Sequence, residues 1–346
     1  MRVLVTGATS LLGRVTAERL IARGDEVTVM QRRPSGLGCR EVLGDIADLA
    51  VVNRAAAGQD VVVHLAAKVD VVGPWSAYME TNVSGTRHVL AACRGAGVGR
   101  LVHVSSPSVA HSGSALVGAG AGPADPERAR GRYARSKAIA ELEALAADSP
   151  GLAVLAVRPH LVWGPGDTQL VGRIVERATT GRLPVIGSGA ALIDSTYIDN
   201  AATALVAAVD RCGRVHGEAL VVSNGEPRPA SELIARICRA AGVPQPRRKV
   251  PLALAWLAGA AVETVWASTG RQSTPPITRF VAEQLATSHW FDQRRTRSLL
   301  AWRPEVSLDQ GFTRLSAWYD SSAAARESRP PVHRTSPAGG AATPAE

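Results

Sequence analysis

The chain has 346 residues, 46% of them hydrophobic, which is enough for one large α/β unit or two interleaved domains. Its formal charge of +9 comes almost wholly from scattered arginines, without the runs of cations and aromatics that a nucleic-acid surface needs, so we expect no nucleic-acid partner. Four cysteines without Cys-x-x-Cys spacing indicate neither a zinc site nor a disulfide framework and fit a reducing cytoplasm.

Short β-branched runs alternate with helical stretches through the first half of the chain, which is typical of a parallel sheet covered on both faces. The opening MRVLVTGA places a strand at the start and leaves no room for a secretory signal peptide. The predicted strands are RVLVT, EVTVM, DVVVHLA, RLVHVSS and LAVLAVRP, and helical spacing appears over 11–22, 77–96 and 132–147. We therefore expect a doubly wound parallel sheet of the Rossmann type.

The alternation loosens after about Pro165, where longer helices are separated by turns that contain Gly and Pro. We expect a dinucleotide-binding domain over 1–165, to which 194–212 return, and a smaller, mostly helical substrate lobe over 166–193 and 213–320. Residues 321–346 lack apolar periodicity and are rich in Ala, Pro and Gly, so we predict a disordered tail.

The longest uncharged apolar stretch, from Val250 to Val262, has 13 residues and is too short to span a bilayer as a helix, which takes about 20. It is either a buried helix of the second lobe or, over 251–268, a contact for a membrane surface or a pathway enzyme.

The stretch VLVTGATSLLGR follows the first strand and opens the first helix, where unpaired backbone N–H groups favour a bound pyrophosphate. It resembles the T-G-x-x-G-x-x-G fingerprint of extended short-chain dehydrogenases/reductases, with Ser10 in place of the middle glycine. Gly7 would make the tight turn, and Gly13 would let helix and strand approach. We expect Ser10 to tolerate the turn with its hydroxyl toward the phosphate. The resemblance adds Thr9, Leu11 and Leu12 to the cofactor contacts.

The second strand ends in Gln31, Arg32 and Arg33, where an NAD enzyme usually has an acid for the ribose hydroxyls. A guanidinium would hold a 2′-phosphate, so we predict NADP(H). The resemblance further implies cofactor contacts at five positions: Asp45, Ile46, Ala66, Ala67 and Pro159.

In RYARSKA, Tyr133 and Lys137 are four residues apart and share a helix face. We expect the ammonium to lower the pKa of the phenol toward the range of acid–base catalysis. In the family, the tyrosine exchanges a proton with the substrate oxygen and the lysine also holds the nicotinamide ribose. The S-S/T-x-x-V pattern assigns the third catalytic residue to Ser106, with Ser105 and Ser108 as alternatives. The eight histidines lack ligand spacing, and we expect no metal.

Six motifs, HLAAK, SSPSV, RPHLVWGPGDTQLVGRI, DSTYIDNAA, VSNGEP and PPITRFVAEQLATSHWF, resemble the bacterial 2-alkyl-3-oxoalkanoate reductases, relatives of the 3β-hydroxysteroid dehydrogenases. The resemblance covers about Arg2 to Tyr319 and implies NADPH-dependent reduction of a β-keto acid to the 3-hydroxy acid. The residues expected to bind the substrate are Lys68 or His160, for its carboxylate, with Ser108 and Trp163. We also expect a homodimer.

Three other functions stay open at this point. A 3β-hydroxysteroid or sterol-4-carboxylate 3-dehydrogenase would use the same catalytic residues for oxidation. A nucleotide-sugar epimerase or dehydratase would need a more polar second lobe. A silent NADP(H)-binding regulator would not need Tyr133, Lys137 and Ser106 together.

Overall fold

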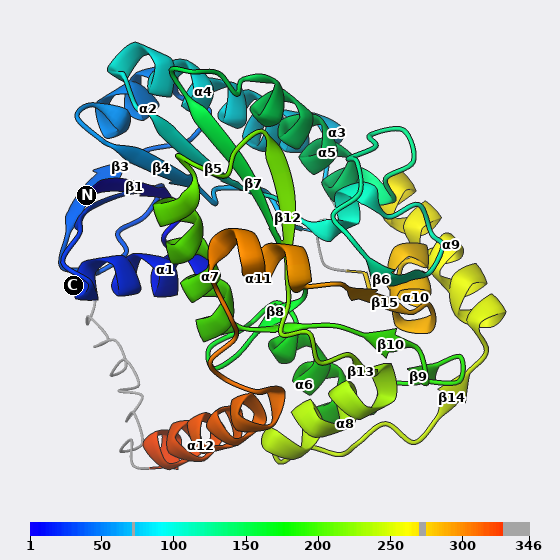
Figure 1. Ribbon diagram of the computed structural model, residues 1–346. Coiled ribbons are helices and arrows are strands. Elements are labelled where there is room, and N and C mark those ends of the chain that lie inside the picture. Colours follow the sequence, from blue (N-terminus) through cyan, green and yellow to red (C-terminus); the bar gives the residue numbers. More distant parts are fainter. Residues whose placement is uncertain (71–72, 270–274, 328–346) are drawn as a thin grey trace, which may run out of the picture.

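A seven-stranded parallel sheet forms the centre of the protein, in the strand order β12-β7-β5-β4-β1-β2-β3. The computed structural model describes residues 1–70, 73–269 and 275–327 (Figure 1). The strands are β1 (Arg2–Thr6), β2 (Glu26–Gln31), β3 (Arg40–Leu43), β4 (Val61–His64), β5 (Arg100–Val104), β7 (Ala153–Pro159) and β12 (Glu218–Val222). The predicted doubly wound fold is confirmed.

Alternate side chains of the central strands serve opposite faces of the sheet. Val3 and Val5 of β1 belong to the core beneath α1 (Leu11–Ala22) and α7 (Ile198–Arg211). Leu4 belongs to the core beneath α2 (Leu49–Ala56), α4 (Gly85–Ala96) and α5 (Gly131–Ala146). Each such side chain contributes about 1.5–3 kcal/mol when fully buried, which is why the central strands contain consecutive apolar residues that serve both faces of the sheet.

The strand order reverses between β1 and β4, and at this point a doubly wound sheet opens a crevice outside the carboxyl ends of its strands. Gly7 lies directly after β1 in this crevice. Its φ of +79° is left-handed, and a Cβ here would come within 2.9 Å of the backbone of Ala66, which follows β4. The turn after β1 is therefore open only to glycine.

The second lobe lies beyond the carboxyl ends of the sheet (Figure 1). Its helices are α6 (Val171–Thr179), α8 (Ala230–Ala240), α9 (Leu252–Thr269), α10 (Arg279–Ala286) and α12 (Leu308–Glu327). Its short strands are β6 (Leu116–Ala119), β8 (Val162–Trp163), β9 (Val185–Ile186), β10 (Leu192–Ile193), β11 (Thr196–Tyr197), β13 (Arg228–Pro229), β14 (Lys249–Val250) and β15 (His289–Phe291). Four of them form the sheet β13-β10-β15-β6, so the lobe is less purely helical than predicted.

The boundaries between the lobes also differ from those predicted. Strand β12, assigned to the second lobe, is the edge strand of the main sheet beside β7, and β6, assigned to the first, pairs with β15. The helix α12 continues to Glu327, so 321–327 are helical rather than a disordered tail. Its AAARE segment consists of strong helix formers. The rest of the predicted tail, 328–346, lies outside the described residues.

Among the described residues, none of the helices has both the length and the apolar character needed to cross a bilayer.

The turn at Gly7 is tested by Gly7→Ala, with Gly24→Ala as the matched control. Gly24 also has a left-handed φ, of +91°, but nothing lies within 4 Å of a Cβ there. Both variants should lose about 1–2 kcal/mol to backbone strain, and Gly7→Ala should lose more because its methyl group presses on the backbone of Ala66. Urea denaturation measures both losses, and equal losses would show that the close approach carries no cost.

Candidate active site

The turn between β1 and α1 is held together by Ser10, the N-cap of the helix. Its Oγ donates to the carbonyl of Gly7 at 2.8 Å and accepts from the N–H of Gly13 at 3.1 Å. With φ −75° and ψ 155°, Ser10 adopts an ordinary extended conformation. The serine therefore fits the turn, as expected, but its hydroxyl caps the helix instead of facing a phosphate. The reason is that the N–H of Gly13 is the nearest unpaired donor.

The other turn residues divide between solvent and the second lobe. Thr9 is exposed at the tip of the turn. Leu11 and Leu12, which open α1, are half-buried against the hydrophobic core around Trp163. Backbone amides of this helix N-terminus are the groups that could bind a pyrophosphate.

The end of β2 presents a buried amide and two exposed cations. Gln31 is buried, and neither its Nε2 nor its Oε1 has a hydrogen-bond partner among the described residues. Arg32 is 80% exposed, with Nη1 3.9 Å from a carboxylate oxygen of Asp45, and Arg33 is also exposed. Next to Asp45, Ile46 is buried against α4. Both arginines are exposed at this edge of the sheet, and an anionic group there would compete with Asp45 for Arg32.

Tyr133 and Lys137 project from the first turns of α5, at the carboxyl edge of the sheet. The Nζ of Lys137 is buried, donates to the carbonyl oxygen of Val104 at 2.8 Å and lies 3.4 Å from Nε2 of His103. Tyr133 is half-buried, with its phenol close enough to Ser106 for that side chain to lower its pKa. The structure thus brings the predicted catalytic hydroxyls together. It also holds the Nζ of Lys137 at the end of β5, through its hydrogen bond to Val104.

Ser106 follows β5 and is the N-cap of a short 3-10 helix, η2 (Pro107–Ala110). Its Oγ lies 2.9 Å from the Oγ of Ser108 and accepts from the Ser108 N–H at 3.3 Å. Ser105 is buried, and its hydroxyl has no partner among the described residues. Of the three candidate serines, Ser106 is the one that reaches Tyr133.

Burial controls the protonation of this pair. It raises the pKa of Tyr133 to about 12, and the opposing hydrogen bond with Ser106 is a smaller effect. Burial also lowers the pKa of Lys137 to about 8, against a smaller raising effect of Glu141. The expected lowering of the Tyr133 pKa by Lys137 is not found in this structure: burial raises that pKa, and the smaller opposing effect comes from Ser106 rather than from Lys137, whose Nζ is bound at Val104.

Asn82 connects the loop after β4 to α5. It lies in a π-helix, η1 (Met79–Ser84), a distortion that is frequent at functional sites. Its Oδ1 accepts from the N–H of Lys68 at 2.7 Å, and its Nδ2 donates to the Lys68 carbonyl at 3.1 Å and to Ser136 Oγ at 2.9 Å. Because Ser136 precedes Lys137, this clamp holds α5 in register with the loop that carries Ala66 and Ala67.

The side chain of Lys68 is already engaged. Its Nζ donates to Asp70 at 2.6 Å and lies 5.4 Å from the centre of the Tyr78 ring. A carboxylate ligand would have to compete with Asp70 for this ammonium, which weakens the case for Lys68 as the substrate contact.

A chain of histidines begins directly after β7, which ends at Pro159. Nε2 of His160 lies 2.8 Å from Nδ1 of His289, whose Nε2 lies 2.8 Å from the carbonyl of Gln284. A carbonyl only accepts, so Nε2 of His289 carries a proton and its Nδ1 accepts from His160. In a neutral His160 this leaves Nδ1 as an acceptor. Burial lowers the pKa of His160 well below its ordinary value, as does repulsion from His289 and His111.

His111, which ends η2, has its ring centre 6.4 Å from that of His289. The ring of His160 also meets that of Phe291 edge-on at 5.0 Å. The histidine chain thus lies at the end of the segment that carries Ser106.

The prediction that Trp163 faces the substrate is wrong. The side chain is 1% exposed, stacks on Phe312 with ring centres 4.5 Å apart, and donates its Nε1–H to Ser195. It belongs to the hydrophobic core of the second lobe because its large apolar surface and its single donor are both satisfied there.

Residues 3–223 match the NAD dependent epimerase/dehydratase family. The chain belongs to this family. This membership confirms the resemblance to extended short-chain dehydrogenases/reductases, which guided the interpretation of the Gly7 turn and of the Tyr133–Lys137 spacing.

Two bacterial relatives and one solved structure illustrate the similarity. A 2-alkyl-3-oxoalkanoate reductase of Stenotrophomonas maltophilia (strain K279a) is 41% identical over 326 residues, covering 92% of this chain and 99% of that protein. A protein of the same name from Shewanella oneidensis is 37% identical over 328 residues, covering 90% and 85%. The structure of MoeE5 in complex with UDP-glucose and NAD has 25% identity and a TM-score of 0.70, covering 93% and 100%.

The residues present fit the nicotinamide dinucleotide on which this family depends. The turn at Gly7 would exclude any Cβ, which leaves the helix N-terminus accessible to a phosphate. The unpartnered amide of Gln31 occupies the end of β2, where a ribose hydroxyl would give it a partner. Ala66 and Ala67 lie half-buried where β4 ends, and small side chains there leave room for a dinucleotide.

Sequence reasoning missed three residues of this site. Gln31 was recognised as the replacement of an acid but not as a ligand, although its place at the end of the second strand was a sufficient signal. His103 could have been suspected as a histidine within an apolar strand. His289 had no local signal, because it is 129 residues from its partner His160.

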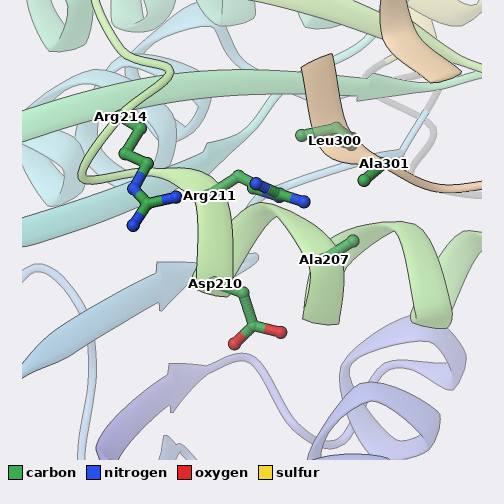
Figure 2. Close-up of a pocket in the computed structure, with 6 residues that line it drawn as sticks. All are labelled: Ala207, Asp210, Arg211, Arg214, Leu300 and Ala301. Atoms are coloured by element: carbon green, nitrogen blue, oxygen red, sulfur yellow. The ribbon is translucent and has the colours of Figure 1, made fainter. Parts of the chain in front are cut away.

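Figure 2 shows a hollow that lies away from the candidate active site. It is lined by Ala207, Asp210, Arg211, Arg214, Leu300 and Ala301, where the end of α7 meets the end of α11 (Arg294–Leu300). The helix α7 ends just before β12 begins, so the hollow lies at the amino edge of the sheet, opposite to Tyr133. It contains none of the predicted site residues.

The buried amine of Lys137 predicts a pH-dependent stability difference between the wild type and Lys137→Met. Between a folded pKa of about 8 and the ordinary lysine value of 10.5, the unfolded chain binds a proton that the folded protein does not, so wild-type stability rises with pH in that window. At pH 7 the buried ammonium destabilises the wild type by as much as about 3 kcal/mol. Lys137→Met removes this cost but also removes the hydrogen bond to Val104, which contributes about 1 kcal/mol.

Lys137→Met should therefore be more stable than the wild type at pH 7, by about 2 kcal/mol, and lose this advantage by pH 10. Urea denaturation at the two pH values measures the difference. Lys249→Met, at an exposed lysine, is the control. A Lys137→Met stability difference that does not change with pH would contradict the assignment.

Proposed function

We propose that the protein reduces a 2-alkyl-3-oxoalkanoate to the corresponding 3-hydroxy acid with NADPH. The carrying observation is the approach of the Tyr133 phenol to Ser106 at the carboxyl edge of the sheet, with Lys137 one turn further along α5 from Tyr133. The names of the two bacterial relatives and their nearly full coverage of this chain support the substrate class.

The two hydroxyls would act on the oxygen of the 3-oxo group. Bound NADPH supplies the hydride that the carbonyl carbon takes up. Ser106 donates a hydrogen bond to the carbonyl oxygen as negative charge develops there, and Tyr133 delivers its proton to that oxygen to complete the alcohol. The ketone is thereby reduced, and the tyrosine regains its proton from solvent.

The raised pKa of Tyr133 favours this direction of reaction. A phenol with a pKa of about 12 is protonated at neutral pH and is ready to act as an acid toward a developing alkoxide. Oxidation of an alcohol, as in a hydroxysteroid dehydrogenase, would need the phenolate as a base, which burial disfavours. This is why reduction is proposed ahead of steroid oxidation.

Lys137 would hold the nicotinamide ribose. Its Nζ donates to Val104 and lies 3.4 Å from Nε2 of His103, which leaves the ammonium at least one further N–H for a ribose hydroxyl. Together with the clamp from Asn82 through Ser136, this would orient Tyr133 toward the reacting carbon.

NADP(H) is proposed over NAD(H) on the residues that end β2. Arg32 and Arg33 are exposed cations directly after a strand that ends in an amide rather than a carboxylate. Guanidinium groups bind phosphate with paired N–H donors, whereas an acid would repel it.

The substrate carboxylate is assigned to His160 in preference to Lys68. Lys68 is paired with Asp70, whereas the hydrogen-bond chain through His289 leaves Nδ1 of His160 without a proton in the neutral state. A bound carboxylate would favour uptake of a proton at that nitrogen, and the resulting imidazolium would donate to it.

Removal of the Tyr133 hydroxyl tests the reaction. Tyr133→Phe should lower kcat for NADPH-dependent reduction of a 2-alkyl-3-oxo acid by about 10²–10⁴, the usual contribution of a positioned general acid. Tyr197→Phe, in the hydrophobic core of the second lobe, is the control and should retain activity. Absorbance at 340 nm follows the reaction with 3-oxo acids that carry or lack the 2-alkyl branch. Activity of the wild type on a 3β-hydroxysteroid but on none of the oxo acids would refute the proposal.

Replacement of both arginines tests the cofactor. Arg32→Ser with Arg33→Ser should weaken NADPH binding by at least about tenfold, since each charge-assisted hydrogen bond contributes about 1.5–3 kcal/mol, and should leave NADH binding unchanged. Arg94→Ser, an exposed arginine near the end of α4, is the matched control. Nucleotide fluorescence titration gives the dissociation constants, and equal weakening of both nucleotides would contradict a 2′-phosphate site.

A further inference from the structure

The helix α9 exposes an apolar surface that the rest of the protein does not cover. Leu254 and Leu257 are each 59% exposed, and Val265 is exposed as well. Trp256 is also exposed, but its Nε1 donates to Glu283 of α10 and its ring faces Arg279, so it belongs to the side of the helix that packs on α10. Surface leucines occur singly in most proteins, but here they share one helix whose first charged residue is Glu263. We call Leu254, Leu257 and Val265 the α9 patch.

The opposite side of the same helix is firmly docked. Ala255 is buried against Ala282 of α10, and a Cβ at Gly259 would come within 2.6 Å of the Arg279 backbone nitrogen, so the two helices pack closely. Glu263 pairs with Arg279 at 2.7 Å. Figure 1 shows α9 at the outer edge of the second lobe, with α10 on its inner side. The helix is thus anchored by one face and presents the α9 patch outward.

Three consecutive cations lead into the helix. Arg247, Arg248 and Lys249 are all exposed, and none of them forms an ion pair with the part of the chain that the structure describes. They precede the first turn of α9 by only two residues. Unpaired cations beside an exposed apolar helix complement an anionic surface with an apolar interior.

We propose that the α9 patch and the Arg247–Lys249 run dock on an anionic lipid bilayer, with the helix lying in the interface. The leucines and valine would enter the acyl boundary, and the three cations would meet lipid phosphates. The charges select a lipid surface over a second copy of this chain, because two such faces would bring their cations together. This inference is independent of the proposed reaction.

Vesicle co-sedimentation of the full-length protein tests the proposal. The protein should bind vesicles that contain phosphatidylglycerol and remain in the supernatant with pure phosphatidylcholine. Replacement of the three cations by Gln should weaken binding by about 100-fold, since each contributes about fivefold near an anionic surface. Leu254→Gln with Leu257→Gln should abolish binding.

Matched controls keep the outcome interpretable. Leu49→Gln with Leu142→Gln removes exposed leucines from α2 and α5, and Arg54→Gln with Arg94→Gln removes exposed cations from α2 and α4. Both controls should bind vesicles like the wild type, and thermal melts check that every variant folds. Wild-type protein that does not sediment with anionic vesicles would overturn the proposal. So would binding that survives loss of the leucines, or an α9 patch that instead forms a dimer in sedimentation velocity experiments.

Discussion

The arrangement of the site depends on one edge of the sheet, at which all seven parallel strands end. Seven parallel strands require a crossover for every connection, so each carboxyl end opens on the same side. Gly7, Gln31, Ala66, Ser106 and His160 follow or end five different strands and therefore meet at one crevice. No single segment contains the site. The second lobe covers this edge, and its His289 reaches back to the residue that follows β7.

Desolvation shapes the chemistry more strongly than the pairing of charges does. Tyr133 and Lys137 share a helix face, yet burial raises the pKa of the phenol to about 12 and lowers that of the amine to about 8. Burial shifts both equilibria toward the neutral forms, although Lys137 remains mostly protonated at neutral pH, and the pKa of Tyr133 is set by desolvation rather than by Lys137. The site is consequently better suited to giving a proton than to taking one, which is the requirement of a reductase.

The second lobe departs from a simple substrate cover in two ways. Strand β6, which comes from the first part of the chain, pairs with β15 of the second lobe. The histidine chain likewise joins the two lobes. Its helix α9 is docked on one side and apolar on the other, an arrangement that would bring the lobe to a surface rather than into solvent. For a protein proposed to act on fatty acid derivatives, a lipid surface is also where such substrates collect.

The local sequence was sufficient for the fold and for much of the site. Apolar β-branched runs at regular separation specify a parallel sheet, a glycine directly after the first strand specifies the turn, and Tyr133 and Lys137 share a face because of helical geometry alone. These features depend on residues that are close together in the sequence, so they can be recognised without the tertiary structure.

Tertiary structure decided everything that depends on burial or on distant partners. Trp163 lies in the core against Phe312, and His160 contacts His289, because each found a partner that is distant in the sequence. The partners of Ser10 and Lys68, by contrast, are local: Gly13 is three residues from Ser10 and Asp70 is two residues from Lys68. The protonation of Tyr133 also depends on the tertiary structure. Its spacing from Lys137 is written in the sequence, but its pKa depends on how much water the folded protein removes, and only the packed structure determines that.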